Sequence, residues 1–143
     1  MKQETPKPKN EAKKELDCLG SVAVNSKTLK TYNEDSGNSY KGENLSAIAI
    51  ADGLGSSVDA HIASDLAVRS FLHEVQAIDT SRKELTFEDV KKIWESTAKK
   101  IKDYYEQNKN RYQDNSKILE TTLITVIELK DSYIVSYLGN GST

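Results

Sequence analysis

The chain has 143 residues, of which 29% are charged and 36% hydrophobic, and its formal net charge at pH 7 is −2. This length suits one domain with its own core. The charge balance argues against a nucleic-acid binder, whose affinity would come from clustered Lys and Arg. No apolar run is long enough to span a bilayer and no secretory signal pattern opens the chain. We therefore expect a cytoplasmic protein that binds neither nucleic acid nor membrane.

The beginning of the chain has the composition of an unfolded segment. Residues 1–16 contain five lysines, three glutamates and two prolines, with hardly any apolar side chains. Such a segment cannot bury enough surface to offset the entropy of ordering it. We expect a flexible charged tail over residues 1–18 and the folded part over residues 19–143. The single cysteine, Cys18, cannot form an internal disulfide.

Two apolar segments predict the first strands. They are GSVAVN at residues 20–25 and LSAIAIA at residues 45–51, and a polar loop is expected between them. Nearly every position of the second segment is apolar, which is typical of a strand covered on both faces.

Two helices are predicted next. From Ser57 to about Ile78, small and apolar residues recur at spacings of three and four, which places them on one helix face: Ala60, Ala63, Ala67, Phe71 and Val75. The two histidines, His61 and His73, are expected at the surface or boundary of this region.

The second helix is predicted to begin after Thr86, which can cap the amide of Asp89 while that acid reaches back towards the cap. An apolar stripe then keeps a 3.6-residue period as far as Asn108. It starts at Phe87 and includes Trp94 and Tyr104, which we interpret as packing residues.

The chain closes with TTLITVIELK and SYIVSYLGN, two runs of β-branched and aromatic residues that predict a tight antiparallel hairpin around Lys130 and Asp131. The predicted order is strand, strand, helix, helix, strand, strand. This order indicates an α+β fold with two long helices packed on an antiparallel sheet.

The segment IAIADGLGSSVDAHIAS at residues 48–64 carries the clearest functional signal. An apolar strand ends at Asp52, turns through two glycines and leads into a helix of small residues. A carboxylate beside a glycine carbonyl suits a hard divalent cation, which prefers oxygen ligands. Two alternatives stay open: Asp52 and Gly53 could form a plain strand-to-helix connection, and Asn33–Asp35 an ordinary Asx turn.

Four motifs in this order resemble the N-terminal half of the metal-dependent protein phosphatases of the PPM, or PP2C, family. They are KTYNED at residues 30–35, ADGLG at 51–55, TTL at 121–123 and LGNGS at 138–142. The resemblance covers about residues 19–143. It implies an αββα sandwich, of which the chain would supply the N-terminal portion without the remaining metal-binding aspartates.

The resemblance also implies a function, the hydrolysis of phosphoserine or phosphothreonine in a phosphoprotein substrate. Two Mg²⁺ or Mn²⁺ ions would be bridged by Asp52, one of them held by the Gly53 carbonyl and Glu34, with Asp35 in support. Lys30 would contact the substrate phosphate, and a metal-activated water would attack phosphorus.

Two departures from the family pattern motivate an alternative. Lys30 stands where the family usually has an arginine, so it offers a point charge without the bidentate fork. Asn140 replaces an aspartate that contributes to an additional metal site. The alternative is a catalytically inactive phosphatase-like module that binds or regulates a partner. The oligomeric state is left open.

Overall fold

The computed structural model describes residues 33–81, 84–113 and 115–138. Within them lie strands β1 (Asp35–Lys41), β2 (Ser46–Asp52), β3 (Leu123–Glu128) and β4 (Tyr133–Leu138). Helices α1 (Ala60–Ser81) and α2 (Phe87–Gln107) separate β2 from β3, and the short 3-10 helix η3 (Lys109–Tyr112) follows α2. The charged tail, the predicted strand at 20–25, Lys30 and residues 139–143 lie outside the described residues.

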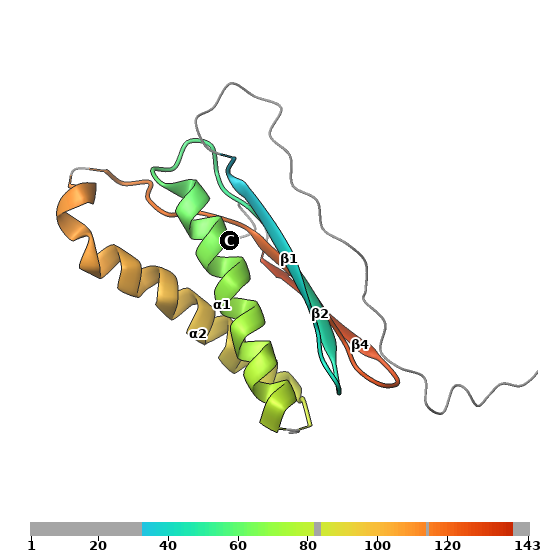
Figure 1. Ribbon diagram of the computed structural model, residues 1–143. Helices are drawn as coiled ribbons and strands as arrows, with labels where there is room; N and C mark the ends of the chain where they lie inside the picture. Colours follow the sequence, from blue (N-terminus) through green and yellow to red (C-terminus); the bar gives the residue numbers. More distant parts are fainter. Residues whose placement is uncertain (1–32, 82–83, 114, 139–143) are drawn as a thin grey trace, which may run out of the picture.

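The strands form one antiparallel sheet in the order β1-β2-β3-β4, and the two helices run antiparallel to each other over one face of it (Figure 1). The predicted α+β class, antiparallel sheet and paired helices are confirmed. The β3–β4 hairpin is confirmed too, with Leu129 N donating to Ser132 O at 2.7 Å. None of the described helices is long and apolar enough to cross a membrane.

The core lies between the sheet and the helices. On β2, the alanines at 47, 49 and 51 are almost fully buried, and on α1 the side chains of Phe71 and Val75 are 0% exposed. Small residues on β2 let α1 approach the sheet closely. The interpretation of β2 as covered on both faces is wrong for its other face, where Ile50 is 46% exposed, because both helices lie on one side of the sheet.

Strand β1 corrects the prediction of a polar loop between the first two strands. Its sequence, DSGNSYK, pairs along its whole length with β2, from Asp35 opposite Asp52 to Lys41 opposite Ser46. It was missed because an edge strand is held by backbone hydrogen bonds and needs no apolar alternation. Among the described residues β1 is at the edge of the sheet, and Asn38 Oδ1 accepts from Ser39 N at 2.8 Å, which satisfies one backbone donor of this strand.

Helix α2 begins as predicted. Thr86 Oγ1 accepts from Asp89 N at 3.2 Å and the Asp89 carboxylate accepts from Thr86 N at 3.0 Å, which completes a capping box. Trp94 packs edge-on against Phe71, with ring centroids 6.1 Å apart, and donates to Ser136 on β4. Phe87 was wrongly placed in the packed stripe: it is 79% exposed, whereas Val90 of the same turn is 6% exposed and belongs to the core.

The far end of α1 is joined to the β1–β2 turn by a buried carboxylate, Asp79. Its two oxygens accept from Tyr40 Oη at 2.6 Å and from three turn amides, those of residues 43, 44 and 45, at 2.8–3.2 Å. Gly42 fits this turn because a Cβ there would lie 2.0 Å from Asp79 Oδ2. The contacts fix the hairpin of β1 and β2 relative to α1.

Candidate metal centre

The predicted acidic residues meet where β1 begins and β2 ends. Asp35 and Asp52 are directly opposite each other in the antiparallel register, and both are exposed. Gly53 N donates to Glu34 O at 2.9 Å, so Glu34 and Gly53, the next pair along the two strands, are a hydrogen-bonded pair. Asp35 and Asp52 therefore form a non-hydrogen-bonded pair, in which Cβ atoms come within about 5 Å of each other. Like charges so placed repel, and a cation between them would offset that repulsion.

The backbone of Asp52 is held from the other side by the TTL motif. Asp52 N donates to Thr122 Oγ1 at 3.1 Å, and Thr122 N donates to Asp52 O at 3.0 Å. Gly53 forms a bridge with Thr121. The sequence marked this motif only through the resemblance, and its contacts give it a physical role: it fixes the main chain that carries the Asp52 carboxylate.

Gly53 lies against the first turn of α1. A Cβ at this position would be 2.7 Å from the carbonyl oxygen of Ala60 and 2.9 Å from its Cβ. Any side chain would therefore push the turn away from the helix. The requirement for glycine here comes from close packing, and it leaves the Gly53 carbonyl on a tightly positioned main chain.

The rest of the loop between β2 and α1 is bound to residues 117–120. Leu54 N donates to Glu120 O, Val58 N to Lys117 O and Leu119 N to Val58 O, at 2.9–3.0 Å. Glu120 N in turn donates to Ser57 Oγ at 3.0 Å. The loop that begins at Asp52 is thus paired with a segment far away in the sequence.

Asp59, the residue before α1, is a feature that the sequence did not reveal. Its side chain is 10% exposed, and its carboxylate accepts from Arg111 Nε at 2.9 Å and Nη2 at 3.1 Å and from Tyr112 Oη at 2.8 Å. The charge of Asp59 raises the pKa of Arg111, while burial, followed by the hydrogen bond to Asp59, raises the pKa of Tyr112. Both partners come from η3, which no local pattern connects to Asp59.

The NED motif contains the Asx contact that was left open as an alternative. Asn33 Oδ1 accepts from Asp35 N at 3.0 Å. This bond fixes the main chain of Asp35 and does not engage its carboxylate, so the Asx turn and a ligand role for Asp35 are compatible.

The donor set is one of oxygen atoms. The carboxylates of Asp35 and Asp52 and the main chains of Glu34 and Gly53 come together at this edge of the sheet, and oxygen donors suit Mg²⁺ or Mn²⁺. Within the described ranges, no three His, Cys, Asp or Glu side chains are grouped closely enough to hold an ion. The residues fit part of a site for a hard divalent cation. Lys30, the predicted phosphate contact, is outside the described residues.

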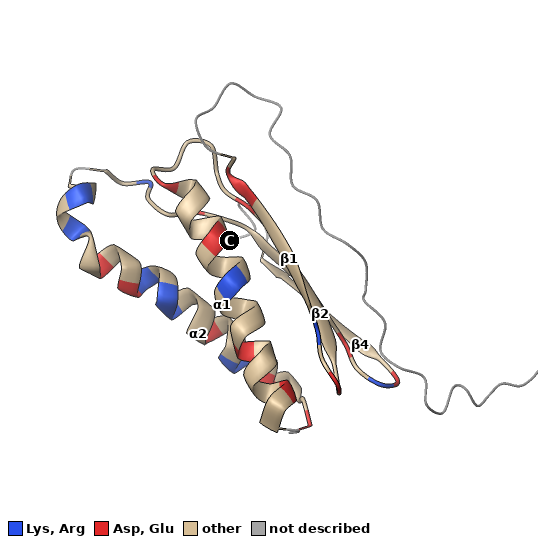
Figure 2. Cartoon of the chain, viewed as in Figure 1, with Lys and Arg blue, Asp and Glu red and all other residues tan. Residues whose placement is uncertain are grey.

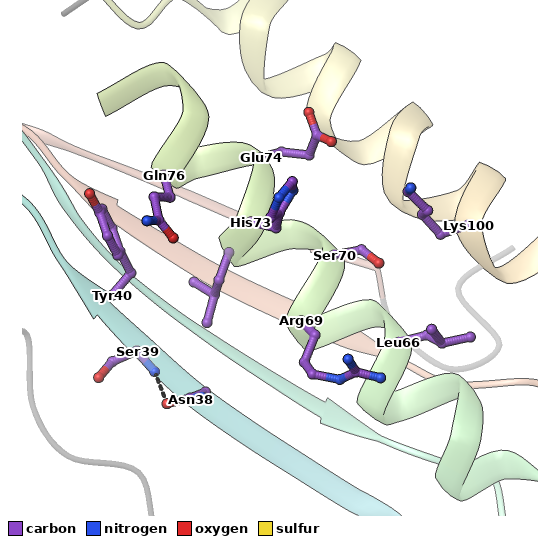
Figure 3. Close-up of a pocket in the computed structure, with 11 residues that line it drawn as sticks. Asn38, Ser39, Tyr40, Leu66, Arg69, Ser70, His73, Glu74, Gln76 and Lys100 are labelled. Carbon is purple, nitrogen blue, oxygen red and sulfur yellow. Dashed lines mark hydrogen bonds between the residues drawn. The ribbon is translucent and has the colours of Figure 1, made fainter. Parts of the chain in front are cut away.

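A separate groove of about 520 Å³ lies between β1 and the helices (Figure 3). Arg69 and His73 of α1 and Lys100 of α2 line it, and Arg69 forms an ion pair with Asp65 at 2.9 Å. None of the predicted site residues that the structure describes lines this groove. His73 is exposed there and His61 is partly buried, as expected for surface and boundary residues.

A model of the protein phosphatase 2C family matches residues 28–143. The chain belongs to the protein phosphatase 2C family. No curated protein and no solved structure matches the chain. The family match covers β1, the ADGLG turn and the TTL motif. It therefore includes every described residue of the candidate metal centre.

Proposed function

We propose that this chain acts as a metal-dependent protein serine/threonine phosphatase, which hydrolyses phosphoserine and phosphothreonine with Mg²⁺ or Mn²⁺. The observation that carries the proposal is the pairing of Asp35 with Asp52 beside the glycine turn, in a chain of the protein phosphatase 2C family. Two like-charged carboxylates directly opposite each other at the end of a sheet repel, and a bound cation would offset that repulsion.

The residues have distinct proposed roles. Asp52 would bridge two ions, Gly53 and Glu34 would hold one of them through oxygen atoms, and Asp35 would support the site. When bound, the ions lower the pKa of a coordinated water and neutralise phosphoryl oxygens. Lys30 would contact the substrate phosphate as a point charge.

The chain itself contributes orientation. Thr122 fixes the Asp52 main chain at both its N–H and its C=O, and Ala60 restricts Gly53. Ligands held in this way lose little conformational entropy when they bind a cation. The exposure of Asp35 and Asp52 leaves the site open to a phosphorylated segment of another protein.

The test is the hydrolysis of a phosphoserine peptide and of an aryl phosphate in the presence of Mn²⁺. Replacement Asp52→Asn should lower the rate by at least about a hundredfold, because the loss of an outer-shell partner alone commonly costs 10- to 100-fold. Asp131 is an exposed acid in the β3–β4 turn, so Asp131→Asn is the matched control and should leave the rate unchanged. Activity that persists in EDTA, or in Asp52→Asn, would contradict the proposal.

A second candidate is a phosphatase-like module without catalytic activity that binds or regulates a partner. The observations that favour it are Lys30 and Asn140, which replace the arginine and aspartate usual in the family. Calorimetric titration with Mn²⁺ separates the two candidates. Binding together with turnover supports the phosphatase, whereas a folded protein that binds no Mn²⁺ supports the inactive module.

A further inference from the structure

The start of α1 is fixed by contacts from η3, the short helix that follows α2. Asp59 has a left-handed backbone conformation, with φ 56°, and its carbonyl accepts from Ile62 N and Ala63 N in the first turn of the helix. Aspartate is one of the few non-glycine residues that adopt this conformation, and contacts to its side chain can hold it there. The contacts in this case come from Arg111 and Tyr112, which bind its carboxylate.

The contacts to Asp59 have the geometry of strong interactions. Arg111 meets the two oxygens of Asp59 with two different nitrogens, at 2.9 and 3.1 Å, which is the bidentate geometry of a strong ion pair. Tyr112 is 2% exposed and stacks on Tyr105 of α2, with ring centroids 5.9 Å apart. The hydroxyl of Tyr112 is therefore presented to Asp59 by a rigid, buried ring.

A short path leads from Asp59 to the candidate metal centre. Asp59 precedes Ala60, and the Ala60 carbonyl is the atom that leaves no room for a side chain at Gly53. A displacement of the first turn of α1 would therefore move Gly53, and with it the main chain of Asp52. Val58, the residue before Asp59, is hydrogen-bonded to Leu119, and this bond also restrains the main chain between Gly53 and α1.

We propose that Asp59 is a positioning residue, which the η3 side chains Arg111 and Tyr112 hold in place so that the Asp52–Gly53 turn is fixed for binding a divalent cation. The proposal rests on the function proposed above for that turn. Asp59 itself binds no ion in this scheme, and its carboxylate acts only through the start of α1.

The first arm of the test needs no metal. Amide hydrogen exchange is measured in the full chain for the parent, Asp59→Asn and Tyr112→Phe. Asparagine tolerates the left-handed conformation, so Asp59→Asn removes the charge and leaves the backbone preference, and Tyr112→Phe removes only a hydroxyl. Exchange at residues 53–58 should rise on the order of tenfold while exchange at residues 46–51 of β2 stays unchanged.

The second arm is calorimetric titration of the same proteins with Mn²⁺. Asp59→Asn should raise the Kd about tenfold, as is common when a supporting residue is lost. Asp65→Asn, which breaks the exposed pair with Arg69 on the same helix, is the matched control and should change neither readout.

Unchanged exchange at residues 53–58 in both variants would overturn the positioning role. So would a uniform rise across the sheet, since that would show a purely global loss of stability. A parent chain that binds no Mn²⁺ would contradict the proposed function, while the exchange result would still decide whether Asp59 fixes the turn.

Discussion

At the scale of single residues, Asp79 shows how one buried carboxylate can hold two elements together. Burial alone would raise its pKa, but the hydrogen bonds from Tyr40 and the turn amides outweigh that effect and lower the pKa below its ordinary value of 3.8. The same contact, after burial, raises the pKa of Tyr40 to about 12. Tyr40 thus remains a donor to Asp79 throughout the neutral pH range.

Because the folded-state pKa of Asp79 is the lower one, its contribution to stability is complete above the ordinary pKa and is lost as the pH falls through the folded-state value. Asp79→Asn should lower the free energy of unfolding at pH 7 by about 2 kcal/mol, since turn amides lose a charged acceptor. The measurement is urea denaturation at several pH values.

The difference between the parent and Asp79→Asn should shrink at acidic pH. Tyr40→Phe, which removes one donor and keeps the carboxylate, is the companion variant and should cost about 1 kcal/mol. A difference between the parent and Asp79→Asn that stays constant down to the most acidic pH would refute this account of Asp79.

At the scale of elements, the capping box of Thr86 and Asp89 sets where α2 begins. The capping box of Thr86 and Asp89 satisfies two backbone donors that the helix leaves unpaired, and Glu88 and Asp89 complement the positive end of the helix dipole. Trp94, two turns further on, needs this helix in place to reach Ser136 at 2.9 Å.

Thr86→Ala should lower the free energy of unfolding by about 1 kcal/mol, because the amide of Asp89 loses its acceptor. Urea denaturation followed by circular dichroism measures this loss. Ser96→Ala, inside the same helix, is the control and should not destabilise the protein, since alanine has the higher helix propensity. Equal stability of Thr86→Ala and the parent would show that the cap has no energetic role.

At the scale of the whole molecule, the described residues give the sheet one face covered by the helices and one face with exposed side chains. The face away from the helices carries Ile50, Ile124, Tyr133, Val135 and Tyr137, which are 46–72% exposed. The register places Ile50, Ile124 and Tyr137 in one row across three strands. Figure 2 shows the charged residues of the described ranges mainly on the helices and near the ends of the strands, so few of those charges lie on this apolar face.

We expect this apolar face of the sheet to drive self-association that depends on protein concentration. Replacing Val135 and Tyr137 together by threonine should shift the sedimentation profile towards the monomer with circular dichroism unchanged, because threonine keeps the β propensity and removes apolar area. Lys91→Thr, on the exposed side of α2, is the control. Association of the double variant equal to that of the parent would refute a role for this face.

Features that depend on neighbours in the chain were predictable. The period of the alanines on α1, the Thr86 box, the β3–β4 hairpin and the end of β2 at Asp52 all arise within one or two turns or strands. Strand β1 was not predictable in this way, because its stability comes from backbone bonds to β2 and its side chains are polar. The burial of β2 was predicted correctly on one face only.

The sequence by itself determined the α+β class, the order of the helices and strands from β2 onwards and the acidic turn at Asp52, because local spacing and backbone preference fix these. Only the tertiary structure decided that Asp35 is opposite Asp52, that Thr122 fixes the Asp52 main chain and that Arg111 reaches Asp59. These contacts join residues 17 to 70 positions apart. Such pairs form only when the sheet and both helices have packed, so no local pattern records them.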